Sequence, residues 1–520
     1  MSPLTAEVLI GQLLMADFSG FSPSPEITRL ITEQHLGGVL LFQKNIESPA
    51  QVARLCRDLQ DLARQAGSPP LLIAVDQEGG PVERLPLGLP GAMALGATRS
   101  AAFAEEAGRI TGRALRAVGC NVDFAPVLDV NSNPANPIIG VRSFGEEPGL
   151  VAQLGSAFAA GLQREGVAAT GKHFPGHGDA DLDSHLDLPV VAHGMERLEA
   201  VEFLPFRHAI REGLGALMTA HIAFTAFGSI PATLSPPVLE GMLRRAWGFD
   251  GVVFTDSFAM APIKEHVGAG PAAVLALLAG ADVLLALGGS DLQREVFASV
   301  RRAAEQGVLS VERLRQSFER VQRLRPRMTP PGPPAEAEAV VASAELRQRA
   351  AEIAGHAVTL VRNEAGMIPL PDGPADVLSL VPQARIPEDA AGQPTLSAML
   401  RTLQRPARDV LLSAGDSWDG ATGGGVVIVV PHSQGRPSPW QVDVVRRAHE
   451  AHGDRLVVVA TGTPYDLADL PPVSTYVATY GREPGLLMAA ARMLLGAAPP
   501  RGRLPVTIPG RYPVGHGIVW

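Results

Sequence analysis

Short apolar runs alternate with longer amphipathic segments from the N-terminus to about residue 325. The longer segments repeat apolar residues with the period of a helix; in 101–118, for example, Phe103, Ile110 and Val118 fall on one face. The short runs predict eight strands, at 9–18, 38–42, 71–76, 121–128, 168–173, 216–221, 252–256 and 282–287. Eight strand-helix units in succession are typical of a (β/α)8 barrel, so we expect an α/β fold that begins with a TIM-type barrel.

Polar residues stand where these predicted strands stop. They are Asp76, Asp129, Lys172, His173, His221 and Asp256. The active site of a (β/α)8 barrel is built at the carboxyl ends of its strands, so residues that are distant in sequence meet there. A doubly wound sheet also alternates strands and helices, but it does not account for so many polar strand ends around one site.

The pattern changes after residue 325, where a proline-rich stretch is followed by an Ala/Glu-rich one. This composition indicates a semi-rigid linker. Beyond it, a helical segment at 344–358 leads into apolar runs at 377–381, 410–412, 426–430, 456–460 and 475–479, with further helical segments at 395–403 and 441–449. We therefore predict a catalytic barrel at 1–325, a linker at 326–343 and a smaller α/β sandwich domain at 344–520.

Composition narrows the class of protein. The 520 residues are 46% hydrophobic and 19% charged, which indicates a globular chain with room for two or three domains. The net charge of -9, without a long basic run, argues against a nucleic-acid or membrane partner. Only Cys56 and Cys120 are present, which excludes a disulfide framework and suits a reducing compartment. The first residues lack the basic and apolar regions of a secretory signal, so we expect a cytoplasmic location.

The densest group of titratable residues follows the fifth predicted strand. Lys172-His173-Phe174-Pro175-Gly176-His177-Gly178 is followed closely by Asp183-Ser184-His185. Buried charges need partners, so such a cluster indicates an active site rather than a polar loop with satisfied histidines. A metal centre is the first alternative, since His173, His177, Asp179, Asp181, Asp183 and His185 all offer ligands. The spacing matches no tight zinc pattern, so we expect no metal and no organic cofactor.

Two further strand ends supply carboxylates. Asp76 precedes Gly79 and Gly80, which let a ligand approach the backbone, and Arg84 follows within reach of the same rim. An arginine and a carboxylate in one pocket can bind sugar hydroxyls, although a rim salt bridge is the plain alternative. Asp256, at the seventh strand end, could be a nucleophile, a base or a metal ligand.

Glycoside chemistry suits these residues. It needs a nucleophilic carboxylate and a proton donor beside the leaving oxygen. Asp256 fits the first role, and His185 can fill the second, with Asp183 positioned to orient and stabilise its ring. A histidine donor departs from the usual plan of two carboxylates.

The sequence resembles glycoside hydrolase family 3, and within it the β-N-acetylhexosaminidase branch. The matching stretches occur in family order: Asp76-Gln77-Glu78-Gly79-Gly80 with Arg84, Arg142-Ser143-Phe144, Lys172 to Gly178, Asp183-Ser184-His185, and Thr255-Asp256-Ser257 before Met260. The resemblance extends more loosely through 358–363 and 502–507, so it spans nearly the whole chain. Pro81 and Phe258 depart from the family pattern, where we expect a basic residue and a leucine.

The resemblance implies a role for each matching residue. Asp256 becomes the nucleophile, and Asp183 with His185 becomes the acid/base. The sugar-binding residues are then Asp76, Arg84, Arg142, Lys172 and His173. The implied enzyme is a retaining exo-β-N-acetylglucosaminidase that acts on small carbohydrates, either muropeptides from cell-wall recycling or chitin fragments. Two alternatives stay open: a phosphorylase, since a neutral histidine would not repel a phosphate acceptor, and an inactive sugar-binding protein.

Overall fold

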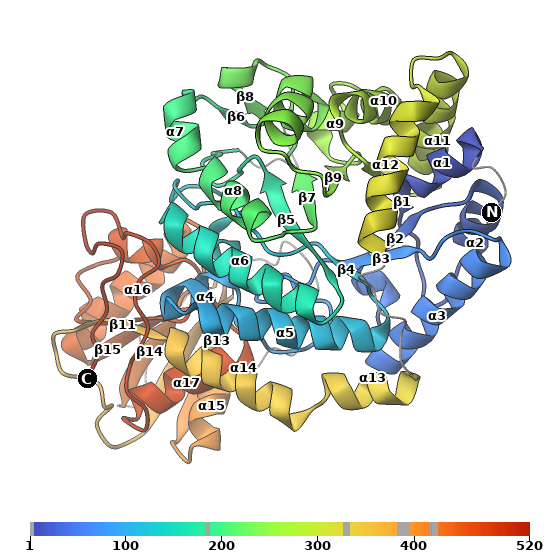
Figure 1. The fold of residues 1–520 in the computed structure, drawn as a ribbon. Helices are drawn as coiled ribbons and strands as arrows, with labels where there is room; N and C mark the ends of the chain where they lie inside the picture. The colour runs from blue at the N-terminus through green and yellow to red at the C-terminus, as the bar shows by residue number, and fades with distance from the viewer. Residues whose placement is uncertain (1–4, 183–187, 326–332, 382–394, 417, 419–424) are drawn as a thin grey trace.

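The computed structural model describes residues 5–182, 188–325, 333–381, 395–416, 418 and 425–520. Two bodies lie side by side, an N-terminal barrel and a C-terminal domain that is orange to red in Figure 1. The barrel is closed, with the strand order β1-β10-β9-β7-β5-β4-β3-β2. Its strands are β1 (Leu14–Ala16), β2 (Gly38–Leu41), β3 (Leu72–Val75), β4 (Val122–Asp123), β5 (Ala168–Phe174), β7 (Ala216–Thr219), β9 (Val252–Ser257) and β10 (Val283–Ala286). The predicted eight-stranded barrel is confirmed.

Helices surround the barrel, and most of them are amphipathic. The principal ones are α2 (Pro25–Gln34), α3 (Pro49–Gln65), α5 (Ala101–Val118), α6 (Pro148–Arg164), α8 (Phe203–Arg211), η5 (Pro237–Ala246), α10 (Ala269–Ala279), α11 (Ser290–Glu305) and α12 (Val311–Leu324). Local sequence sets their ends. In α5 the Ser100 hydroxyl accepts a hydrogen bond from Phe103 N, and Gly119 ends the helix with a φ of 89°. The predicted helix at 101–118 is therefore correct to the residue.

The first predicted strand, 9–18, is wrong in its first half. Residues Ala6–Gln12 form helix α1, and β1 begins only at Leu14. Thr5 starts the helix, because its side chain accepts a hydrogen bond from Val8 N. A continuous apolar run buries equally well as a helix face or as a strand, so the run alone could not separate the two.

The C-terminal domain is built on a six-stranded sheet of order β11-β16-β15-β14-β12-β13. Its strands are β11 (Thr359–Asn363), β12 (Ala375–Val381), β13 (Ala407–Ser413), β14 (Val426–Val430), β15 (Leu456–Ala460) and β16 (Thr475–Ala478). β11 pairs antiparallel with β16, and the other pairs are parallel. The helices α14 (Ala344–Ala357), α15 (Leu396–Thr402), α16 (Pro439–His452) and α17 (Pro484–Leu494) complete the domain. The predicted smaller α/β domain is confirmed.

The segment expected to be a linker is partly helical. Residues 326–332 lie outside the described part of the chain, but Pro334–Val341 forms helix α13, which packs against α3 and α5. Ala337 and Val341 are buried in this contact. This part of the predicted linker therefore belongs to the packed surface of the barrel, and the boundary at 343 stays a prediction.

Loops of the C-terminal domain reach the site-bearing side of the barrel. Asn131, in the loop after β4, donates from Nδ2 to the hydroxyl of Tyr465 at 2.7 Å. Glu146, farther along the same loop, accepts from Thr507 N at 2.8 Å and donates its own N–H to Pro505 O at 3.1 Å. The second domain therefore supports the loop that presents Arg142 to the site.

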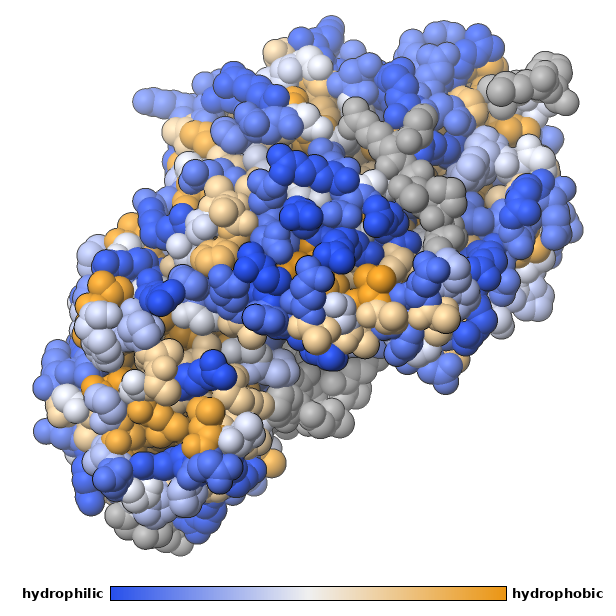
Figure 2. Space-filling view, turned by 60° about the horizontal axis from the view of Figure 1, so that its bottom comes forward, coloured by the Kyte–Doolittle hydropathy of each residue, from blue (hydrophilic) through white to orange (hydrophobic). Residues whose placement is uncertain are grey.

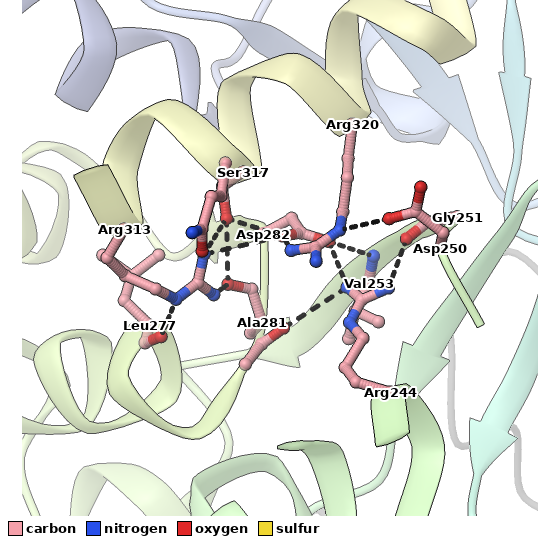
Figure 3. Close-up of polar contacts among 12 residues, drawn as sticks. Arg244, Asp250, Gly251, Val253, Leu277, Ala281, Asp282, Arg313, Ser317 and Arg320 are labelled. Carbon is pink, nitrogen blue, oxygen red and sulfur yellow. Dashed lines mark hydrogen bonds and ion pairs between the residues drawn. The ribbon is translucent and has the colours of Figure 1, made fainter. Parts of the chain in front are cut away.

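The opposite, amino-terminal end of the barrel is closed by a buried ion cluster (Figure 3). Asp282, just before β10, is fully buried and accepts from Ser317 Oγ at 2.6 Å and Val253 N at 3.0 Å. Three arginines face it: Arg244 and Arg320 contact its carboxylate and Arg313 lies 3.9 Å away. These contacts join η5, β9, β10 and α12 at the end of the barrel opposite the site. Polar networks at that end serve stability.

The surface agrees with a globular chain of ordinary charge content. Hydrophilic residues dominate the face seen in Figure 2, with smaller hydrophobic groups between them. Among the described residues, no helix combines the length and apolar character needed to cross a membrane.

Candidate active site

The strand ends bring most of the predicted site residues into one network. Asp76 follows β3, Lys172 and His173 lie near the end of β5, and Asp256 lies near the end of β9. Arg142 comes from the short helix η2 (Gly140–Arg142) in the loop after β4. All strands of a parallel barrel end on the same side, so these side chains converge although nearly 200 residues separate the first from the last.

Lys172 is the centre of this network. Its Nζ lies 2.7 Å from Asp76 Oδ1 and 2.6 Å from Glu78 Oε1, and the residue is 2% exposed. Burial acts to lower the pKa of this ammonium, but Asp76 and Glu78 outweigh it and the pKa is raised. Lys172 is therefore a charged donor with one N–H left after its two carboxylate contacts.

Glu78 fixes Arg142 in a single orientation. Arg142 donates from Nε to Glu78 Oε2 and from Nη2 to Glu78 Oε1, both at 2.8 Å. Burial acts to raise the pKa of Glu78, but Arg142 and Lys172 hold it well below its usual range. A bidentate pair of this kind adds geometric precision as well as energy, so the remaining face of the guanidinium is held in place for a ligand.

Asp129 orients two histidines. Its carboxylate accepts from His173 Nδ1 at 2.8 Å, from His173 N at 3.1 Å and from His177 N at 2.7 Å. Burial acts to raise the pKa of Asp129, but His173 and His177 lower it overall. An ionised carboxylate only accepts, so Nδ1 of His173 bears the proton. Arg142 Nη2, 3.4 Å from His173 Nε2, can only donate, so Nε2 faces it with a lone pair.

Asp256 is held as a carboxylate on β9. Its Oδ1 accepts from Ser257 N at 2.7 Å. Burial acts to raise its pKa, but the nearby His221, His173 and Lys172 lower it below the usual range. An ionised, oriented carboxylate at a barrel strand end suits a nucleophile.

His221 lies beside Asp256 as a neutral ring. Burial lowers the pKa of His221 even though Asp256 acts to raise it. Its Nε2 lies 3.0 Å from Ser257 O, and its Nδ1 lies 2.9 Å from Thr233 Oγ1. Phe258 stacks on the ring at 6.4 Å with planes 15° apart, so the phenylalanine that departs from the family pattern has a defined partner.

The loop after β3 is tied together by Gln77. Its Oε1 accepts from Arg84 N at 2.8 Å and from Leu85 N at 2.9 Å. Gly80 has a φ of 63°, and a Cβ there would lie 2.8 Å from Gly91 Cα, so this turn requires glycine. The guanidinium of Arg84 donates to Glu83 O at 3.4 Å, and the described contacts include no ion pair between Arg84 and Asp76. Asp76 is paired with Lys172 instead.

The predicted acid/base residues, Asp183 and His185, lie outside the described residues, so their roles stay predictions. The chain on either side of them is held at two points. Asp179 Oδ2 lies 2.7 Å from His193 Nε2, and β6 (Val190–Val191) pairs with β8 (Ala223–Phe224). The metal alternative included both of these residues; in the described part of the chain no group of three His, Cys, Asp or Glu side chains is arranged around a metal position.

Sequence reasoning assigned no role to three residues that organise the site. Asp129 and His221 were recognised as polar strand ends, and Glu78 was recognised as part of a motif. Their contacts with His173, Asp256 and Arg142 depend on side-chain directions across different strands. The signal that could have found them was the presence of an acid or histidine at each strand end beside an assigned residue.

Comparisons with known proteins identify the family of this chain. Residues 5–324 match the model of the glycosyl hydrolase family 3 N-terminal domain. β-Hexosaminidase A of Pseudoalteromonas piscicida is 30% identical over 97% of this chain and 97% of its own length. A β-hexosaminidase of Thiobacillus denitrificans is 38% identical over 55% of this chain and 81% of its own length.

A solved structure is similar over both domains. It is a glycoside hydrolase family 3 β-N-acetylglucosaminidase from Paenibacillus sp. str. FPU-7, with 38% identity and a TM-score of 0.90. The match covers 97% of this chain and 99% of that chain. The chain therefore belongs to glycosyl hydrolase family 3, in its β-hexosaminidase branch, because the family model and these relatives match it and it has the barrel with strand-end carboxylates.

Proposed function

We propose that this glycoside hydrolase is a retaining exo-β-N-acetylglucosaminidase in which Asp256 is the nucleophile. The observation that supports this most is the position of Asp256: it lies half-buried near a barrel strand end, Ser257 N orients its carboxylate, and its neighbours lower its pKa. Attack by this carboxylate on the anomeric carbon would break the glycosidic bond and form a covalent glycosyl-enzyme. Water would then release the sugar with its β configuration kept.

The acid/base role goes to His185, with Asp183 as its orienting partner. Protonated His185 would donate its proton to the departing oxygen, and neutral His185 would then accept a proton from the attacking water. This assignment rests on the resemblance of Asp183-Ser184-His185 to the family motif. Asp183 would favour the protonated imidazole in the first step because opposite charges attract at short range.

The polar network beside Asp256 would bind the sugar. Asp76, Arg142, Lys172 and His173 offer charged or oriented polar groups, and Arg84 lies on the neighbouring loop. Hydrogen bonds in which one partner is ionised are about twice as strong as neutral ones, which suits recognition of hydroxyl and N-acetyl groups. The network is fixed by Glu78 and Asp129 before any ligand arrives, so little ordering is required on binding.

The natural substrates we propose are N-acetylglucosaminides of cell-wall recycling or chitin fragments, handled in the cytoplasm. The β-N-acetylglucosaminidase name of the Paenibacillus relative supports the sugar. Cys56 and Cys120 are both buried and free, which suits a reducing compartment.

An assay of Asp256 tests the proposal. The assay compares wild type with Asp256→Ala on p-nitrophenyl β-N-acetylglucosaminide and p-nitrophenyl β-glucoside. The control is Asp291→Ala, which alters a side chain that is 97% exposed. We expect wild type and control to release p-nitrophenol from the N-acetylglucosaminide with strong preference, and Asp256→Ala to be inactive. Near-normal turnover by Asp256→Ala would refute the nucleophile.

Product analysis tests the remaining features. NMR of the first sugar released should show the β anomer; the α anomer would refute retention. The reaction is repeated in phosphate buffer. If N-acetylglucosamine 1-phosphate is the main product, the enzyme is a phosphorylase rather than a hydrolase. Tight sugar binding without turnover of either aryl glycoside would favour the inactive sugar-binding protein.

A further inference from the structure

One buried carboxyl group beneath the site has no role in the mechanism above. Asp123 is the last residue of β4 and is fully buried. In the β3–β4 pairing, Asp123 is in register with Val75, the residue that precedes Asp76. Its Oδ1 accepts a hydrogen bond from Gln77 N at 2.9 Å. Gln77 lies between Asp76 and Glu78, whose carboxylates both contact Lys172. Asp123 therefore holds the backbone between these two residues in place.

The charges around Asp123 are already balanced without it. The ammonium of Lys172 is bound by Asp76 and Glu78, and the guanidinium of Arg142 is bound by Glu78. Among the described residues no cation lies within hydrogen-bonding distance of Asp123, and its Oδ2 has no hydrogen-bond partner there. A buried carboxylate without a cation of its own is strongly disfavoured relative to the neutral acid.

We propose that Asp123 is a positioning residue of the sugar site that acts as an uncharged acid. Its Oδ1 fixes Gln77 N and so sets the spacing of Asp76 and Glu78 on Lys172, while its proton keeps a third negative charge away from that lysine. The inference rests on the sugar-binding role proposed above for Asp76 and Lys172.

The electrostatic surroundings agree with this assignment. Burial raises the pKa of Asp123 well above its usual range, and Asp76 and Glu78, from the loop after β3, raise it further. Gln77 N and Lys172, on the same loop and on β5, act in the opposite direction without reversing the shift. The groups facing Asp123 therefore favour its neutral form.

Two substitutions separate an uncharged role from an ionic one. Asp123→Asn keeps an oxygen that can accept from Gln77 N and has the shape of the neutral acid, whereas Asp123→Ala removes the acceptor. On p-nitrophenyl β-N-acetylglucosaminide we expect Asp123→Asn to keep kcat/KM within about threefold of wild type. For Asp123→Ala we expect KM to rise about tenfold, with a smaller fall in kcat, because one hydrogen bond of about 1.4 kcal/mol corresponds to a factor of ten.

A second measurement does not depend on activity. An acid whose folded-state pKa is raised keeps its proton on folding, while the unfolded chain releases that proton above its ordinary pKa of 3.8. Its wild-type contribution to stability therefore falls as pH rises above about 4. Asparagine does not titrate, so the melting temperature of Asp123→Asn should gain on wild type steadily from pH 5 to pH 8. All other titrating groups are common to both proteins and cancel in this difference.

The outcomes are distinguishable. An Asp123→Asn variant that is as defective as Asp123→Ala, with a melting deficit that stays constant from pH 5 to pH 8, would show an ionised partner of Lys172 and overturn the proposal. If wild type does not turn over the substrate, the proposed function fails, and the melting comparison still decides the state of Asp123. If Asp123→Ala does not fold, the asparagine variant alone decides it. Asp291→Asn, at a fully solvated position, is the matched control and should change neither measurement.

Discussion

Replacing Asp129 by asparagine should reverse the proton arrangement of His173. Asp129→Asn keeps an oxygen that can accept from the backbone N–H groups of His173 and His177, which now lie 3.1 and 2.7 Å from Oδ1. The substitution replaces Oδ2, which lies 2.8 Å from His173 Nδ1, by an NH2 group. A donor facing Nδ1 favours the tautomer with the proton on Nε2. That proton would then point at Arg142 Nη2, which is also a donor, 3.4 Å away.

The size of the effect follows from the bond that is lost. A hydrogen bond to a charged group contributes about 1.5 to 3 kcal/mol, which corresponds to a loss in kcat/KM of about 10- to 150-fold. The pKa of Asp129 is lowered in the folded protein, so its contribution to stability is complete above the unfolded-state pKa and is lost as pH falls through the folded value. The melting deficit of Asp129→Asn should therefore be full at pH 7 and shrink below about pH 4.

Two measurements check this reasoning. Steady-state kinetics on p-nitrophenyl β-N-acetylglucosaminide give kcat/KM, with Asp291→Asn as the exposed control. NMR of 15N-labelled histidine reports which ring nitrogen of His173 bears the proton. An unchanged Nδ1 proton in Asp129→Asn, or a kcat/KM within twofold of wild type, would refute the role assigned to Asp129.

Two further predictions concern stability. Asp282→Asn removes the carboxylate shared at the amino end of the barrel. Breaking a buried ion pair costs about 3 to 5 kcal/mol, so for a barrel of this size the melting temperature should fall by about 4 to 7 °C while kcat/KM of the folded enzyme stays unchanged. A parallel loss of kcat/KM in the folded variant would contradict the separation of this cluster from the site. Burial raises the pKa of Glu483 to about 7. Burial and the charge of Glu483 raise the pKa of Glu83 to about 8. Both acids therefore keep their protons on folding, and stability should fall as pH rises from about 4.5 through 8. Glu483→Gln should make the fall in melting temperature between pH 5 and pH 8 less steep, and a slope equal to that of wild type would exclude Glu483 as a contributor.

The barrel was predictable because its strands are buried on both faces. Runs such as 38–42 and 252–256 are continuously apolar and are separated by helices with regular apolar faces, so the order of elements can be counted. The errors fall where local signals compete. The run at 9–18 contains a capped helix before its strand, and helix α13 follows a stretch whose composition suggested a linker. At the first place a local cap, Thr5, starts the helix; at the second, α13 packs against α3 and α5.

Most of the site residues were also predictable, since the carboxyl ends of parallel strands meet on one side of a barrel. This rule predicted the convergence of Asp76, Lys172, His173 and Asp256 without any distance being known. It did not predict which groups pair. A salt bridge between Arg84 and Asp76 was only the alternative to their shared role in sugar binding, and the ion-pair partner of Asp76 in the structure is Lys172 of β5.

By itself, the sequence determined the succession of strands and helices and the kinds of chemical group at each strand end, because both depend on residue type and period along the chain. The tertiary structure alone decided the charge state and direction of those groups. Glu78 orients Arg142, Asp129 sets the tautomer of His173, and the burial of Asp123 beneath Lys172 favours its neutral form. These properties depend on distance and on exclusion of water, which side chains acquire only when separate strands are brought together.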